Sequence, residues 1–264
     1  MQLRVTHRTE YEYDRPLPYA LQRLRLMPQS GPTQQVVRWT LAIEGAVEEV
    51  RFLDQFANDT RLVSVTGMAR QIAIVAEGEV DTTETSGVYG QHRGFAPLWL
   101  FSAPTELTRA GDGVADLAAG LPGGSDIDRL HALMAIVRAR IAFVPDATDT
   151  QTAAEAALAH GKGVCQDHAH VFIAAARHLG FPARYVSGYL MLDGQARQAA
   201  SHAWAEAHVA GLGWVGFDAA NGISPDTRYV RLATGRDYRD AMPVSGIVLG
   251  KAAERLAVSI TVEQ

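Results

Sequence analysis

The spacing of hydrophobic and polar positions changes near residue 105, and this change divides the chain into two parts. In the first part, short apolar runs alternate with polar residues, and turn residues such as Gly31-Pro32, Asn58-Asp59 and Gly67 separate them. Short strands at this spacing are typical of an antiparallel sheet or sandwich. We therefore expect a β-rich N-terminal domain over residues 1–105.

The second part begins with helical spacing. Apolar residues recur every three to four positions between residues 126 and 141, and Ser125 or Asp126 stands at the N-cap position before them. This pattern is typical of a helix with one buried face. An alanine-rich helix is expected over residues 152–159, and another from Cys165 to a stop at Gly180.

Strand spacing returns after Gly180. The expected strands cover residues 183–192, 201–209 and 213–218, the stretch 229–250 reads as irregular, and a last strand covers residues 255–262. A helix followed by an antiparallel meander predicts an α+β fold. We assign residues 106–264, including the last strand, to a catalytic domain in which the cysteine-bearing helix packs on an antiparallel sheet.

Composition and charge narrow the class of protein. The chain has 264 residues, 47% of them apolar, a net charge of −5 and one cysteine. Scattered basic residues give no reason to bind nucleic acid or an anionic membrane. One cysteine excludes an intramolecular disulfide and a cysteine-based zinc site. With no apolar run near the roughly 20 residues that span a bilayer and no leader pattern at Met1, we expect a cytoplasmic protein.

Cys165 lies at the expected N-terminus of a helix, a position that favours a nucleophilic thiol. Gly161 and Gly163 precede it, and the apolar run from Val171 begins one and a half turns later. A thiol at a helix N-terminus meets free N–H groups and the positive end of the macrodipole, which favour the thiolate. Cys165 is therefore the candidate nucleophile.

His202 and Asp218 are the candidate partners of the thiol. A neighbouring imidazole activates a thiol, and a carboxylate can hold that imidazole in one tautomer. His202 shares one face of its strand with Trp204 and Glu206, whereas alanines form the other face. The hairpin at residues 210–213 brings Asp218 back beside residues 202–205. These registers leave the geometry of the Cys–His contact open.

The backbone N–H of Cys165 is expected to be one oxyanion donor. Gln166, Trp204 and Trp99 are candidates for the second donor, and nothing in the sequence discriminates among them. Asp167 and Tyr189 are further candidates for the wall of the cleft. The polar stretch 235–240 either borders the cleft or forms a solvated loop.

Other polar residues near Cys165 have simpler interpretations. His168 and His170 suggest a metal site, but residues two apart on a helix point in different directions, so we expect them at the cleft rim or the surface. Glu206 is expected to form a structural ion pair with Arg184 rather than to orient His202.

Four sequence blocks carry a resemblance to a known family. Residues 163–167 (Gly-Val-Cys-Gln-Asp), 182–189, 202–206 and 213–218 are similar, in this order, to the bacterial transglutaminase-like superfamily. The resemblance covers residues 130–222, and the β-rich first part resembles the N-terminal region that accompanies this domain in bacterial members.

This resemblance implies a papain-like core with a triad of Cys165, His202 and Asp218 and a covalent thioester intermediate. It implies neither a metal nor an organic cofactor. Members commonly have a proline after the aspartate, where this chain has Ala219, and this difference loosens the turn at Asp218 but leaves every triad position filled.

The leading hypothesis is an acyl-transfer enzyme that attacks a peptide or carboxamide carbonyl of a peptide or protein substrate. If water resolves the thioester, the protein is a cysteine peptidase or amidase. If an amine does, it is a transglutaminase or a ligase. We favour hydrolysis, because no amine channel is visible and because bacterial members are described as cysteine proteases. The alternative is a non-catalytic binding module on the same fold. The oligomeric state is not indicated.

Overall fold

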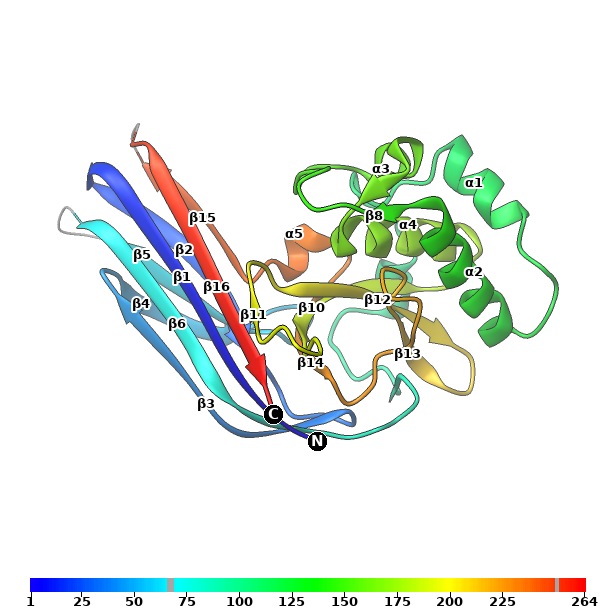
Figure 1. The fold of residues 1–264 in the computed structure, drawn as a ribbon, viewed down its shortest axis with the longest axis horizontal. Coiled ribbons are helices and arrows are strands. Elements are labelled where there is room, and N and C mark those ends of the chain that lie inside the picture. Colours follow the sequence, from blue (N-terminus) through cyan, green and yellow to red (C-terminus); the bar gives the residue numbers. More distant parts are fainter. Residues whose placement is uncertain (66–68, 250–251) are drawn as a thin grey trace.

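The chain folds into two parts that lie side by side, an elongated set of strands and a sheet covered by helices (Figure 1). The computed structural model describes residues 1–65, 69–249 and 252–264, and the turn expected at Gly67 lies outside them. The α+β class expected from the sequence is confirmed, with an antiparallel N-terminal region before the helices.

Two antiparallel sheets form the elongated part, which we call the sandwich. The larger sheet has the order β11-β16-β1-β6-β3 and the smaller β15-β2-β5-β4. The strands of the larger sheet are β1 (Gln2–Leu17), β3 (Gln34–Glu44), β6 (Ala69–Thr82), β11 (Arg197–Gln198) and β16 (Glu254–Glu263). The strands of the smaller sheet are β2 (Tyr19–Met27), β4 (Val47–Leu53), β5 (Asp59–Val65) and β15 (Val244–Leu249).

The alternation along β1 explains how the sandwich buries its core. Every second residue from Leu3 to Tyr13 is buried, and the residues between them are exposed or partly exposed. Successive side chains of a strand point to opposite faces, so one face of β1 packs inward. The sandwich core also takes in Tyr189 and Val230 from the other part of the molecule.

The position of the last strand differs from the sequence-based expectation. We had placed it in the catalytic domain, but β16 pairs with β1 in the sandwich, from Arg4 opposite Glu263 to Tyr13 opposite Glu254. Likewise, β15 lies within the stretch expected to be irregular, and it pairs with β2. Alternation reveals a strand but not its partner, and β1 offers an edge whose backbone groups need pairing.

The second part is built on a five-stranded antiparallel sheet with the order β14-β10-β12-β13-β7. We call it the catalytic sheet. Its strands are β7 (Val88–Gly90), β10 (Ala183–Leu190), β12 (His202–Val209), β13 (Gly213–Phe217) and β14 (Tyr229–Gly235). The three strands expected between residues 183 and 218 are therefore present, and β14 was missed.

Helices cover one face of the catalytic sheet (Figure 1). They are α1 (Asp112–Ala119), α2 (Asp126–Arg140), α3 (Ala154–His160) and α4 (Cys165–His178). The shorter elements are a 3₁₀ turn at Leu98–Phe101, α5 (Tyr238–Ala241), and the parallel pair β8 (Ala142–Phe143) and β9 (Lys162–Gly163). No helix in the described ranges is long and apolar enough to cross a membrane.

Helix α4 is buried because small side chains let it approach the sheet closely. The alanine face of β12, which includes Ala203, Ala205 and Ala207, belongs to the same core as Ala174 and Ala175 of α4. Helices α1, α2 and α3 also contact α4. The cysteine-bearing helix is thus held from several sides at once, which fixes the position of its N-terminus.

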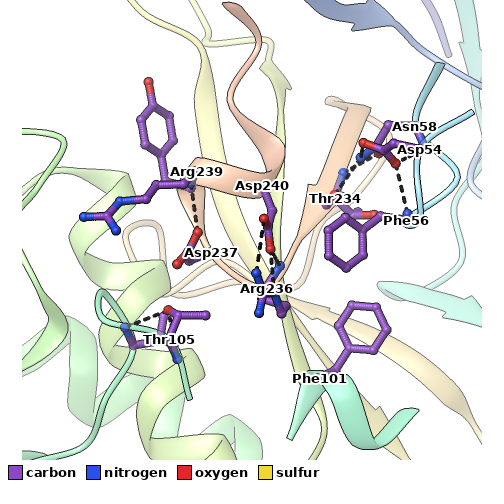
Figure 2. Close-up of polar contacts among 12 residues, drawn as sticks. Asp54, Phe56, Asn58, Phe101, Thr105, Thr234, Arg236, Asp237, Arg239 and Asp240 are labelled. Carbon is purple, nitrogen blue, oxygen red and sulfur yellow. Dashed lines mark hydrogen bonds and ion pairs between the residues drawn. The ribbon is translucent and has the colours of Figure 1, made fainter. Parts of the chain in front are cut away.

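Buried polar contacts fasten the two parts together. Figure 2 shows Asn58 beside Thr234, where the Asn58 amide donates to the Thr234 carbonyl at 2.8 Å and the Thr234 N–H donates back at 2.8 Å. The same view shows Asp240 holding Arg236 at 2.8 Å and Asp237 capping α5 by accepting from the Arg239 N–H. The Asn58–Thr234 pair joins β14 to the residue before β5, whereas the contacts of Asp240 and Asp237 hold the local turn at α5.

Candidate active site

Three residues from separate elements meet at one end of α4. Cys165 is the first residue of α4, His202 is the first of β12, and Asp218 follows the last residue of β13. His202 Nε2 lies 2.6 Å from Asp218 Oδ2. The Cys165 side chain lies close enough to the His202 imidazole to raise the pKa of His202. The structure thus brings together all three residues that the sequence singled out.

The question left open by the strand register has a simple geometric answer. The alanine face of β12 packs on α4, and His202 lies on the other face, with Trp204 stacked beside it at a ring distance of 6.3 Å. Cys165 begins α4 and His202 begins β12, so the thiol and the imidazole come together at the first residues of the two elements. Nε2 is engaged by Asp218, which leaves Nδ1 to exchange a proton with the thiol.

Asp218 lies in a pocket of hydrogen-bond donors. Its Oδ1 accepts from the backbone N–H groups of Ala220 and Asn221 at 3.0 and 3.2 Å. Its Oδ2 accepts from Asn221 Nδ2 and the Tyr229 hydroxyl, each at 2.8 Å, in addition to His202. Burial favours the protonated carboxyl, but the hydrogen bonds from His202, Asn221 and Tyr229 outweigh it and lower the pKa of Asp218.

The charge state of His202 follows from its neighbours. Burial by itself lowers the pKa of an imidazole, but the hydrogen bonds to Asp218 and Cys165 and the negative charges of both groups raise the pKa of His202 to about 10. An imidazolium at neutral pH stabilises a neighbouring thiolate. The three residues therefore form the charge arrangement that a nucleophilic thiol needs.

Sequence reasoning missed Asn221 and Tyr229. Both donate to Asp218, and Asn221 Nδ2 also lies 3.5 Å from His202 Nε2. Tyr229 packs edge-on against Trp204, with a ring distance of 5.4 Å. The position of Asn221 three residues after Asp218 was a usable signal, because short turns bring such side chains together. Tyr229 lies on β14, and nothing in the sequence pointed to that strand.

The expected cleft residues have different roles. Trp204, a candidate oxyanion donor, is buried and stacks beside His202, and Gln166 is nearly buried in the first turn of α4. Asp167 caps α4 instead, because its Oδ2 accepts from the Val164 N–H at 2.7 Å and from the Thr148 hydroxyl at 2.6 Å. Trp99 is largely exposed on the 3₁₀ turn.

Tyr189 does not line the site. It is fully buried in the sandwich core, where its hydroxyl lies 3.0 Å from His7 Nδ1. Tyr189 and Val186 lie on opposite faces of β10, and only Val186 packs with Trp204. The expectation is therefore wrong, because the odd positions at this end of β10 face the sandwich.

The expectation for His168 and His170 is also wrong, since both are buried core residues. His168 lies against the carbonyls of Val164 and Ile141, at 2.8 and 3.0 Å. His170 Nε2 accepts from the Tyr238 N–H at 3.2 Å, and burial lowers the pKa of His170 to about 3. Within the described ranges, no group of three His, Cys, Asp or Glu side chains could hold a metal ion.

The expected ion pair of Glu206 is confirmed and extended. Glu206 Oε2 lies 2.5 Å from Arg184 Nε, and Glu206 Oε1 lies 2.9 Å from Arg231 Nε. All three residues are buried or nearly so. This cluster lies beneath Trp204 on the same face of β12, so it supports the wall beside His202 rather than taking part in its chemistry.

Comparisons with known proteins agree with this picture. Residues 115–219 match the family model of the transglutaminase-like superfamily, and residues 3–81 match that of the bacterial transglutaminase-like N-terminal region. An uncharacterized protein of Mycobacterium tuberculosis is 30% identical, with 98% of this chain and 91% of that protein covered. An uncharacterized protein of Mycobacterium leprae is 27% identical, with 98% of each chain covered.

A solved structure has the same fold. It is that of a "putative cysteine protease" from Cytophaga hutchinsonii, with a TM-score of 0.79 and 20% sequence identity. The similarity covers 100% of this chain and 91% of that one. The two proteins therefore share both the sandwich and the catalytic sheet.

Proposed function

Because this chain belongs to the transglutaminase-like superfamily, we propose that it is a thiol enzyme of acyl transfer in which Cys165 attacks a peptide or carboxamide carbonyl. The observation that carries the proposal is the position of His202, which is hydrogen-bonded to Asp218 Oδ2 and lies close enough to the Cys165 side chain for that side chain to raise its pKa. Its raised pKa supports a thiolate–imidazolium pair at neutral pH.

The first half of the reaction follows from the groups around the thiol. The Cys165 thiolate attacks the carbonyl carbon, and the negative charge moves to the carbonyl oxygen. The backbone N–H of Cys165, at the start of α4, can bind this oxyanion. When the tetrahedral species collapses, His202 gives its proton to the leaving amine, and a thioester to Cys165 remains.

The second half uses the same histidine as a base. Nδ1 of the neutral imidazole takes a proton from water, and the resulting hydroxide attacks the thioester carbon. Collapse expels the Cys165 thiolate, releases a carboxylic acid and restores the imidazolium. Hydrolysis is favoured over transfer to an amine because Cys165 is partly exposed, so solvent water reaches the thioester.

The rate of alkylation by iodoacetamide as a function of pH tests this proposal. Because Cys165 is the only cysteine, the intact mass reports on this thiol alone. We expect a rate plateau that persists well below pH 7 and disappears in His202→Ala. A rate that rises only near the ordinary thiol pKa of about 8.5 would overturn the proposal. An unlabelled native protein would do the same.

A further inference from the structure

A groove runs between the sandwich and the catalytic half beside the candidate active site. Tyr11 of β1 and Leu256 and Val258 of β16 line one wall, and Ser201 and Tyr238 line the other. The groove is open to solvent and has a cavity volume of about 180 Å³. Its first wall exists only because β16 pairs with β1 and places Leu256 opposite Tyr11.

The groove lies beside the candidate active site. Ser201 immediately precedes His202, and Tyr238 packs against the same core as Cys165. Burial, followed by the negative charge of Cys165, raises the pKa of Tyr238. Tyr238 is held by the capped turn of α5 that Figure 2 shows, with Asp237 at its start. Through Ser201, the groove therefore borders His202, the partner of the thiol.

The lining of the groove is uncharged. None of its lining residues among those the structure describes is Asp, Glu, Lys or Arg. The one titratable imidazole, that of His7, has its Nδ1 3.0 Å from the Tyr189 hydroxyl and its Nε2 3.2 Å from the Thr9 hydroxyl. Burial lowers the pKa of His7 to about 4, so this side chain is neutral at neutral pH.

These features select one class of side chain. Aliphatic and aromatic walls gain free energy when they remove apolar surface from water. A charged side chain would lose hydration in the groove and find no opposite charge there. The occupant that fits is thus uncharged and apolar, and its backbone must reach Cys165.

We propose that this groove is a substrate subsite, which binds an uncharged apolar side chain next to the amide that Cys165 attacks. The inference rests on the proposed function and adds a substrate class to it: peptides with an aliphatic or aromatic residue beside the scissile bond. It also gives the sandwich a role, because β1 and β16 supply one wall of the subsite.

Three thiol reagents separate this inference from the proposed function. Iodoacetamide reports only on the thiol, N-(3-phenylpropyl)iodoacetamide adds an apolar arm, and N-(3-aminopropyl)iodoacetamide adds a cationic arm. Each alkylation rate is divided by the rate of the same reagent with glutathione, which removes differences in intrinsic reactivity. We expect the normalised rate of the phenylpropyl reagent to exceed those of the other two at least about tenfold, as burial of an aromatic arm implies.

A pair of variants on neighbouring positions of β16 provides the control. Leu256 is 51% exposed, so Leu256→Lys is compatible with folding, and Ala257 is also exposed but points to the opposite face. We expect Leu256→Lys to lower the preference for the phenylpropyl reagent several-fold, and Ala257→Lys to leave it unchanged.

The outcomes distinguish the two proposals. A normalised preference near one in the unmodified protein would overturn the subsite, and so would an equal loss in both lysine variants. An iodoacetamide profile without a low-pH plateau, combined with a retained preference for the apolar arm, would overturn the proposed function but support an apolar binding groove.

Discussion

Replacing Asp218 by asparagine would reverse the hydrogen-bond polarity around His202. In Asp218→Asn, the amide can place its oxygen at only one of the two carboxylate positions, and the backbone donors of Ala220 and Asn221 require it at Oδ1. The amide NH₂ then faces His202 Nε2, which must accept. The neutral imidazole is thereby forced to carry its proton on Nδ1, the atom that should receive the proton of the Cys165 thiol.

The size of the effect follows from the contact that is lost. A hydrogen bond to a charged group contributes about 1.5–3 kcal/mol, and one pKa unit corresponds to about 1.4 kcal/mol. Loss of the Asp218 charge should therefore lower the pKa of His202 by about 1–2 units from its value of about 10. The thiolate–imidazolium pair weakens by the same free energy, so alkylation of Cys165 at pH 6 should slow by at least about tenfold.

The assay is the iodoacetamide rate between pH 5 and pH 10, with thermal unfolding to show that the variant is folded. Tyr229→Phe is the matched control, because it removes one neutral donor at 2.8 Å from Asp218 Oδ2 but keeps the charge. Its alkylation profile should shift by less than that of Asp218→Asn. If Asp218→Asn folds and keeps the low-pH plateau, the role assigned to Asp218 is refuted.

Two further predictions concern stability. Because the folded protein keeps His170 neutral, with a pKa of about 3, while the unfolded chain takes up a proton below its pKa of 6.5, the free energy of unfolding should fall as the pH drops from 6.5 towards 3. For one group this slope is at most about 1.4 kcal/mol per pH unit. Urea unfolding at each pH should show a flatter slope in His170→Gln and the original slope in the exposed control His178→Gln. An unchanged slope in His170→Gln would contradict the low pKa assigned to His170. Ala205→Leu places three extra carbons between β12 and α4, where Ala205 is fully buried. It should lower the free energy of unfolding by about 1–3 kcal/mol in the same assay. An unaltered midpoint of urea unfolding would mean that the helix and the sheet are not closely packed.

Local chemistry was predictable from the sequence. The glycines before Cys165, the apolar run after it and the alternation around His202 each act within a few residues, so the helix, the strands and the three meeting residues could be foreseen. The contact between the thiol and the imidazole at the first residues of α4 and β12 could not be foreseen. It depends on how far α4 is shifted along β12. That shift is set by packing of alanines such as Ala205, which leave no mark on periodicity.

Long-range partnership was not predictable. The sequence showed an alternating segment near residue 260, but nothing in it indicated that the partner was β1 some 250 residues earlier. Tyr229 was missed for the same reason, since β14 reaches Asp218 only through the order of strands in the sheet. His170 was placed at the surface because a helix with polar residues normally exposes them, whereas α4 is surrounded on every side.

The pairing of β16 with β1 has a consequence for folding during synthesis on the ribosome. Strand β1 emerges before β16 and keeps an open edge until β16 has also emerged, because Arg4 lies opposite Glu263. Everything between them, including α4 and the catalytic sheet, has left the ribosome by then. The wall formed by Leu256 and Val258 is therefore added after Cys165, so a chain that lacks β16 would carry its cysteine without a finished groove beside it.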